Sequence, residues 1–318
     1  MRTFDYLLNN SEIWLQYAIR VNLLNEKKEE LVELKNKALQ DDKIKNYLED
    51  IAKFHEVLVR NHKDPDLPIH KLLFLLDIGF DVSEPKIEMA ITQIMAHKDE
   101  HGVYQSLTNI PKHYGGKGED TFGWCLCDAP LLLLALLKAK VDFDKHIKKG
   151  VDYLVSLHHG EGFSCSVSSE HGKFRGPGRK DDCCPYAMLV MLRLFSLIPE
   201  YQNSEIANGC VETMLSLWEN SMERHPYMFY MGTDFRKLKA PSLWYDIVSV
   251  SDCLSKFECV KQDKRFQEMI AIIRSKQTVN GLFIPEAVYQ KFKEWDFGQK
   301  KKPSPYLTYL CEKIFQQI

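Results

Sequence analysis

The chain has 318 residues, of which 45% are hydrophobic and 27% are charged, and its formal net charge is −2 at pH 7. This composition is typical of a globular protein and excludes a disordered or collagen-like chain. The 42 basic and 44 acidic residues nearly balance, so the chain lacks the basic field that nucleic-acid binding needs, and we expect no such partner. The longest purely apolar run, Ala129–Leu137, has nine residues and is too short to span a membrane.

The N-terminus and the cysteines indicate where the protein resides. The first residues, MRTFDYLLNNSEIWLQ, contain charged and Asn residues where a secretory signal needs an apolar core. The nine cysteines are an odd number, which favours reduced thiols or metal ligands over a disulfide framework. We therefore expect a soluble cytoplasmic protein.

The N-terminal region, residues 1–67, is rich in charge and is predicted to be helical. Helices are expected over Ser11–Leu24 and Lys27–Val59, the second with a break near Asp41 and Asp42. We interpret this region as a helical cap or an extra hairpin packed on the remainder of the chain, residues 68–318.

From residue 68 onward, an amphipathic helical pattern recurs about every 60 residues. Ile87, Ile91 and Ile94 have the spacing of one helix face, and apolar residues follow each of them at an offset of 60. The pattern returns four times in all, which indicates an internal repeat. The predicted helices are Lys86–His97, His146–His158, Glu205–Trp218 and Arg265–Lys276.

A second, more apolar set of helices alternates with the first. Helices that are apolar all round are buried on both faces, so each repeat is predicted to be a hairpin of one inner and one outer helix. Sustained strand alternation and a βαβ pattern are absent from the sequence, and we predict an all-α fold. The inner helices are predicted at His70–Phe80, Cys127–Lys140, Cys184–Leu197, Trp244–Phe257 and Pro305–Phe315.

The segment Gln277-x-x-x-Gly281-x-Phe283 resembles the end of the repeat motif found in two families. These are the squalene–hopene-type terpenoid cyclases and the β subunits of protein prenyltransferases. The resemblance covers roughly residues 68–318 and implies an α/α toroid, in which helical hairpins close into a barrel. It leaves open a partner subunit, because prenyltransferase β subunits work with an α subunit.

Metal-ligating side chains gather where the inner helices begin. Zinc binds thiolates, imidazole and sometimes carboxylate in a tetrahedral set, and the stretch from Cys165 to Cys184 supplies all three types. We predict a zinc site formed by Cys165, His171, Asp182 and Cys184, with Cys127 as a further candidate. The alternatives are that these cysteines pack as small apolar residues or have a redox role.

An Asp-x-Cys element in this stretch resembles the zinc-binding element of the prenyltransferase β subunits. It fits either Asp181 with Cys183 or Asp182 with Cys184. Those enzymes take a His from the start of a later inner helix, and here Asp246 occupies the comparable place.

The same stretch also resembles the Asp-x-Asp-Asp motif of class II terpenoid cyclases, whose middle Asp is an acid. Here Arg179 replaces the first Asp, and a nearby cation favours the ionised carboxylate, which opposes proton donation. Asp181 and Asp246 are the catalytic candidates, and helix capping is the alternative role of an Asp at this position.

Aromatic residues cluster before and within one inner-helix start. An aromatic-lined cavity suits an apolar or prenyl-like small molecule, whereas core filling is the alternative. The predicted pocket residues are Tyr227, Phe229, Tyr230, Trp244 and Tyr245.

Three functions follow as hypotheses. The first is a zinc-dependent transferase, lyase or cyclase that acts on an apolar or prenyl-like molecule. The second is a non-catalytic binding module with a structural zinc ion. The third is a class II-type cyclase that uses Asp181 as its acid.

Overall fold

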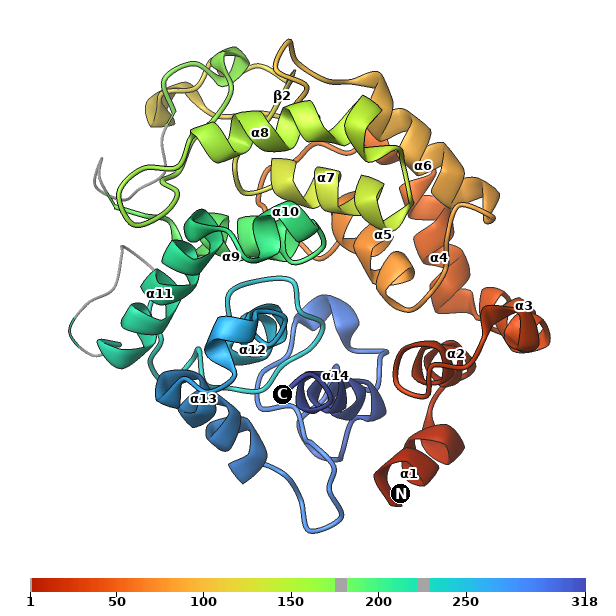
Figure 1. Cartoon of the computed structure of the whole chain (residues 1–318). Coiled ribbons are helices and arrows are strands. Elements are labelled where there is room, and N and C mark those ends of the chain that lie inside the picture. Colours follow the sequence, from red (N-terminus) through yellow and green to blue (C-terminus); the bar gives the residue numbers. More distant parts are fainter. Residues whose placement is uncertain (1, 175–181, 222, 224–228) are drawn as a thin grey trace. The chain divides into compact units, whose positions relative to one another are not determined.

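The computed structural model describes residues 2–174, 182–221, 223 and 229–318. The described residues form fourteen α-helices, several short helical turns and one small sheet (Figure 1). The chain divides into two compact units. Unit 1 comprises Met1–Tyr47, Asp77–Gly79 and Met231–Ile318, and unit 2 comprises Leu48–Leu76 and Phe80–Tyr230.

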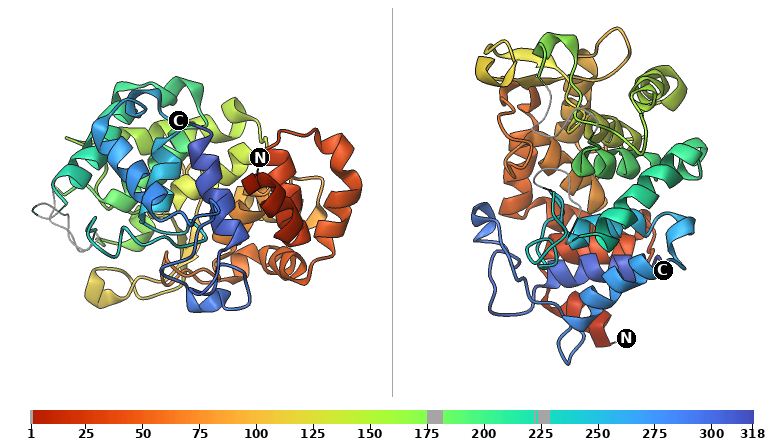
Figure 2. Two further views of the ribbon diagram at one scale, coloured as in Figure 1. Left: turned by 90° about the horizontal axis from the view of Figure 1, so that it is seen from below. Right: turned by 90° about the vertical axis from the view of Figure 1, so that its left-hand side faces the viewer.

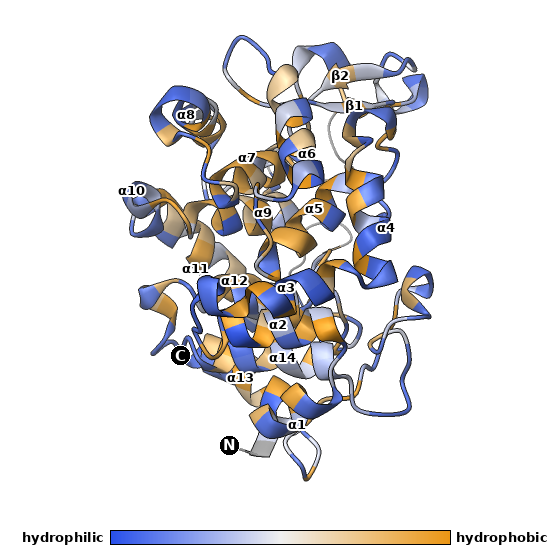
Figure 3. Cartoon of the chain, turned by 90° about the vertical axis from the view of Figure 1, so that its right-hand side faces the viewer, coloured by the Kyte–Doolittle hydropathy of each residue, from blue (hydrophilic) through white to orange (hydrophobic). Residues whose placement is uncertain are grey.

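Unit 2 contains helices that are buried almost throughout and helices that bury one face only. Along α7 and α9 nearly every side chain is buried, whereas α6, α8 and α11 each bury one face. Apolar residues accordingly dominate α7 in Figure 3. Within this unit α7 contacts α6, α8 and α9, and α9 also contacts α11. The helices of unit 2 are α5 (Pro68–Asp77, except its last residue), α6 (Pro85–Ala96), α7 (Ala129–Lys138), α8 (Lys148–Ser156), α9 (Pro185–Phe195), α10 (Pro199–Gln202) and α11 (Glu205–Glu219). Helix α4 (Asp42–Ile51) passes from unit 1 into unit 2 after Tyr47.

Unit 1 combines the N-terminal helices with the C-terminal third of the chain. Helix α14 contacts α1, α2 and α12, and α12 contacts α13, so the red and dark blue helices lie side by side in Figure 2. The helices are α1 (Arg2–Asn10), α2 (Ile13–Asn22), α3 (Val32–Leu39), α12 (Ile247–Leu254), α13 (Lys264–Ser275) and α14 (Pro305–Phe315).

The motif that ends α13 forms a closed turn. The Gln277 side-chain amide donates a hydrogen bond to the carbonyl oxygen of Gly281 at 3.0 Å. Gly281 has a φ of +80°, which glycine adopts without the strain that a Cβ would cause. Phe283 is fully buried two residues later, so the motif anchors the chain after the outer helix.

The small sheet is a difference from the all-α prediction. Strand β1 (Ser106–Thr108) pairs antiparallel with β2 (Thr121–Gly123), and Leu107 lies opposite Phe122. Strands of three residues are too short to show a two-residue periodicity in the sequence. The described part of the chain is mostly helical and contains this one small sheet.

The break predicted near Asp41 is confirmed, because α3 ends at Leu39 and α4 begins at Asp42. The closure of the hairpins into a toroid, and a domain boundary at residue 67, stay predictions. In the part of the chain that is described, no helix combines the length and the apolar character needed to cross a membrane.

Candidate functional site

A strand-like loop in unit 2 lies between the starts of two inner helices. On one side of it, the amide of Leu126 donates to the carbonyl of Ser166 at 2.9 Å, and the amide of Ser168 donates to the carbonyl of Trp124 at 2.9 Å. On the other side, the amide of Cys184 donates to the carbonyl of Phe163 at 2.7 Å. The backbone therefore carries Cys165 between the residues that precede α7 and those that precede α9.

Three of the predicted zinc ligands meet at this loop. Cys127 is in hydrogen-bond contact with both Cys165 and Cys184. All three residues are partly exposed, and none of the three is in a disulfide. We call this set the thiol centre.

The pKa values of Cys127 and Cys184 are shifted in opposite directions. The thiol of Cys127 donates to Cys184, and this bond is the main cause of a lowered Cys184 pKa. The backbone amides of Ala187 and Tyr186, in the first turn of α9, lower that pKa further, while burial opposes them. The pKa of Cys127 is raised by its bonds to the two other thiols and by burial. Of these two thiols, Cys184 therefore has the lowered pKa and Cys127 the raised one.

The neighbouring Cys183 has the opposite character. Burial raises its pKa, and the charges of Glu161 and Asp182 raise it further. A Cβ added at Gly162 would lie 3.3 Å from the Cys183 Sγ atom, which places this sulfur beside Gly162. Cys183 also interacts electrostatically with Cys210 of α11. The two adjacent cysteines therefore occupy different environments, and the charge of Asp182 raises the pKa of Cys183.

His171 belongs to a second polar group, with Asp128. The His171 side chain is buried beside β2, because a Cβ at Gly123 would lie 2.5 Å from its Nε2 atom. Burial lowers the pKa of His171, and the Asp128 carboxylate raises it. Asp128 is 3% exposed, and its Oδ1 accepts the Cys125 amide at 3.0 Å. Burial raises the pKa of Asp128, while the charges of His62 and His171 lower it.

The His171–Asp128 group contains unsatisfied polar atoms. Among the described residues, Asp128 Oδ2, His171 Nε2 and His62 Nδ1 are buried without a hydrogen-bond partner. Sequence reasoning did not single out Asp128 or His62. The available signal for Asp128 was its position just before the apolar run Ala129–Leu137, where an Asp is expected to be a helix cap.

Whether these side chains suit zinc depends on chemistry and on arrangement. Thiolate and imidazole are ligands that zinc prefers, so the chemistry of the donors fits. However, within the described ranges no group of three or more His, Cys, Asp or Glu side chains is arranged to hold a metal ion. The zinc site stays a prediction, and we assign no chemical step to a metal.

Asp246 lies in unit 1, where it caps α12. Its Oδ1 accepts the amides of Val248 at 3.0 Å and Ser249 at 2.9 Å. The side chain is fully buried, and burial raises its pKa to about 6, although the Lys239 ammonium, 3.9 Å from Oδ2, lowers it. Asp246 is therefore a buried carboxyl group that titrates close to neutral pH.

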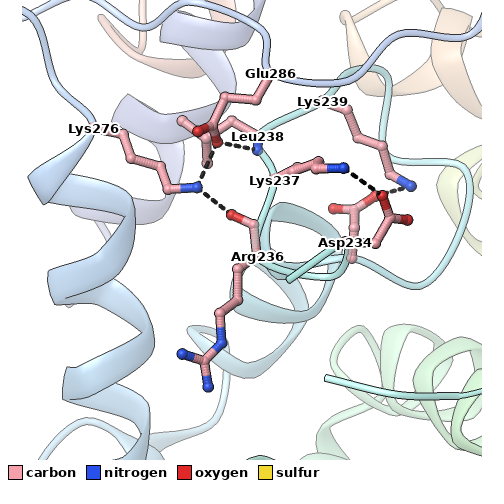
Figure 4. Close-up of polar contacts among 8 residues, drawn as sticks. Asp234, Arg236, Lys237, Leu238, Lys239, Lys276 and Glu286 are labelled. Atoms are coloured by element: carbon pink, nitrogen blue, oxygen red, sulfur yellow. Dashed lines mark hydrogen bonds and ion pairs between the residues drawn. The ribbon is translucent and has the colours of Figure 1, made fainter. Parts of the chain in front are cut away.

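The loop that carries Lys239 is held by an ion pair from a distant segment. Figure 4 shows Lys276 donating to the Glu286 carboxylate and to the carbonyl of Arg236. Glu286 in turn accepts the amide of Leu238 at 2.8 Å and donates its own amide to the Leu238 carbonyl at 2.8 Å. These bonds fix the backbone that positions Lys239 against Asp246.

The predicted aromatic pocket is described in part. Tyr230 is 38% exposed, whereas Tyr245 is buried with its ring centroid 5.1 Å from that of Phe235. Trp244 and Phe229 are partly exposed. A pocket lined by these rings stays a prediction.

Two predicted site residues, Asp181 and Tyr227, lie outside the described residues. The chain matches no known family model, no curated protein and no solved structure.

Proposed function

We propose that the thiol centre of unit 2 is a thiol–disulfide exchange site, with Cys184 as the attacking thiolate and Cys127 as the resolving thiol. The observation that supports this is the direct contact of two thiols with opposite pKa shifts. The thiolate is the nucleophilic form of cysteine. A low-pKa, accessible cysteine beside a second thiol is the arrangement found in redox-active cysteines.

The substrate class is a small disulfide. The Cys184 thiolate attacks one sulfur atom of the disulfide, forms a mixed disulfide and releases the other sulfur as a thiolate. Cys127 then gives its proton to that thiolate and attacks the Cys184 sulfur, so that the second half of the substrate leaves as a thiolate. The substrate is reduced by two electrons, and the protein gains a Cys127–Cys184 disulfide.

The local structure supports each role. The amides of Tyr186 and Ala187 stabilise negative charge on Cys184 before substrate arrives. Cys127 is already in contact with the sulfur that it attacks. Cys127 and Cys184 are partly exposed residues, although burial of their sulfurs acts to raise the pKa of each. Such transient catalytic disulfides are compatible with the predicted cytoplasmic location.

The test uses oxidised glutathione as the probe. The reduced full-length protein is mixed with it, and the remaining thiols are alkylated and located by peptide mass mapping. We expect a glutathione adduct or a disulfide at Cys184, and we expect Cys184→Ser to lose the reaction. Cys183→Ser is the matched control, since this neighbour is also partly exposed, and it should react as the unmodified protein does. Equal oxidation in Cys184→Ser and the unmodified protein would refute the proposal.

A zinc-dependent enzyme that acts on an apolar or prenyl-like molecule is the second candidate. The contact of three soft donors from separate segments favours it. Bound zinc would supply Lewis-acid chemistry or a metal-activated thiolate. Stoichiometric zinc that protects Cys127, Cys165 and Cys184 together from alkylation would favour this candidate over thiol exchange.

A non-catalytic module with a structural zinc ion would show the same protection together with a rise in thermal stability. The class II-type cyclase reaction rests on Asp181, and the described residues add no support for it.

A further inference from the structure

We infer that a hollow in unit 1 binds a small phosphorylated molecule that has an apolar part, with Lys300 as the cation that receives the phosphate. The hollow has a volume of about 550 Å³ and is lined by Lys276, Ile284, Pro285, Glu286 and Lys300. Pockets that bind small molecules have volumes of about 300–1,000 Å³. This site is independent of the thiol exchange that we propose for unit 2.

A backbone hydrogen bond brings two separate stretches of unit 1 to the same hollow. The amide of Ser304 donates to the carbonyl of Phe283 at 2.9 Å, so the ends of the segment between these residues lie side by side. Ile284 follows Phe283 directly, and Lys300 comes shortly before Ser304. The bond therefore accounts for the presence of Ile284 and Lys300 on the walls of one hollow.

The loop that carries Lys300 is closed by the side chain of Gln299. Its Oε1 atom accepts the amides of Lys301 at 2.7 Å and Lys302 at 2.9 Å. Its Nε2 atom donates to the carbonyls of Asp296 and Lys302, both at 2.9 Å. A loop that is already ordered loses less conformational entropy when it binds a ligand, which favours binding at Lys300.

The two lysines of the hollow differ in what they already bind. Lys276 donates to the Glu286 carboxylate and to the carbonyl of Arg236 (Figure 4), so the charges of Lys276 and Glu286 largely offset each other. Lys300 is exposed and makes no ion pair with any residue that the structure describes. The hollow therefore has a net positive charge, and Lys300 is the cation that is available to an incoming anion.

The side chains that line the hollow indicate the chemistry of the ligand. Both cations among the described lining residues are lysines, and the lysine ammonium binds phosphate as a point charge, whereas carboxylates are favoured by the planar fork of arginine. A phosphate monoester carries a charge of about −1.5 to −2 at pH 7, so it gains more than a carboxylate from two nearby lysines. Ile284 and Pro285 offer an apolar surface to the rest of the molecule.

The test titrates the full-length protein with phenyl phosphate and measures binding by isothermal titration calorimetry. We expect one saturable site that binds phenyl phosphate more tightly than inorganic phosphate, by roughly fivefold, because the ring covers apolar surface. Lys300→Met should weaken the binding of phenyl phosphate by about tenfold, since a hydrogen bond to a charged group is worth about that ratio. Lys301→Met is the matched control, because Lys301 is exposed but does not line the hollow, and it should bind as the unmodified protein does.

Glu286→Gln gives a change in the opposite direction. The variant keeps an oxygen that can accept the Leu238 amide, now bound at 2.8 Å, but it removes the negative charge and releases Lys276 for the phosphate. It should therefore bind phenyl phosphate more tightly than the unmodified protein. Equal binding by Lys300→Met and Lys301→Met would overturn the inference, and so would the absence of saturable binding to the unmodified protein. Equal affinities for inorganic phosphate and phenyl phosphate would overturn the apolar part of the assignment.

Discussion

The helix starts at Cys184 and Asp246, one in each unit, each place an ionisable side chain near the first backbone amides, and the two pKa values shift in opposite directions. Each residue precedes the first turn of a helix. Asp246 Oδ1 accepts two backbone amides there, whereas Cys184 makes no side-chain cap hydrogen bond and the nearby amides of Ala187 and Tyr186 only lower its pKa. Yet the pKa of Cys184 is lowered, whereas the pKa of Asp246 is raised to about 6. The amides of a helix start favour an anion, but they do not decide its charge alone.

The difference lies in the burial and the other polar neighbours of each ionisable group. Cys184 is partly exposed and has a thiol donor in Cys127. Asp246 is 0% exposed, and its Oδ2 makes no hydrogen bond among the described residues, with the Lys239 ammonium at 3.9 Å. Desolvation of a fully buried carboxylate outweighs two amides and one distant cation. Burial and local donors therefore distinguish a ready thiolate from a carboxyl group that resists ionisation.

The largest expected effect tests the burial of Asp246. Because the folded pKa of Asp246 is about 6 and its ordinary value is 3.8, the native state binds more protons than the unfolded state between these two pH values. The free energy of unfolding that Asp246 contributes is present below about pH 4 and is lost as the pH rises through about 6, by roughly 3 kcal/mol. Asp246→Asn should remove this loss, so the stability difference between variant and unmodified protein should change between pH 4 and 7 in urea unfolding.

The other titrating groups cancel in that difference, because both proteins contain them. A difference that is constant across the pH range would show that Asp246 is not buried as described.

The second prediction removes the donor from the thiolate. Cys127→Ala should raise the pKa of Cys184, because the largest cause of its lowering is lost. Alkylation of Cys184 by iodoacetamide at pH 7 should slow by roughly fivefold to tenfold. Cys127→Ser keeps a hydrogen-bond donor and should slow it less. An unchanged rate in Cys127→Ala would mean that the helix amides suffice.

The smallest effect concerns the distant cation. Lys239→Met removes an ammonium group 3.9 Å from Asp246 Oδ2, so the pKa of Asp246 should rise further above 6. At pH 7 the variant should lose about 1 kcal/mol of unfolding free energy, and the loss should shrink as the pH falls to 5. Lys237→Met is the control, because Lys237 pairs with the exposed Asp234 and should change stability little at either pH.

Much of the helical structure could be predicted from apolar spacing. Helix α14 has the predicted bounds, Pro305–Phe315, and α11 extends one residue beyond the prediction. The sheet could not be predicted, since β1 and β2 have three residues each and pair through the geometry of a long loop.

The residues of the candidate site could be predicted from the sequence, but the contacts among them could not. Cys127, Cys165 and Cys184 stand out in the sequence, but their meeting depends on the strand-like pairing of Ser166 with Leu126, which no helical period reveals. The partnership of His171 with Asp128 was missed because an Asp before an apolar helix looks like an ordinary cap.

The most direct test of the account compares Cys183 with Cys184 in one molecule. Iodoacetamide modification of the reduced, chelator-treated protein is followed at each cysteine by mass spectrometry from about pH 6 to 10, which spans the usual thiol range. We predict that Cys184 becomes reactive at a lower pH than Cys183, because a thiol donor and the nearby helix amides lower the pKa of Cys184 whereas burial raises that of Cys183. Equal midpoints, or earlier modification of Cys183, would contradict it.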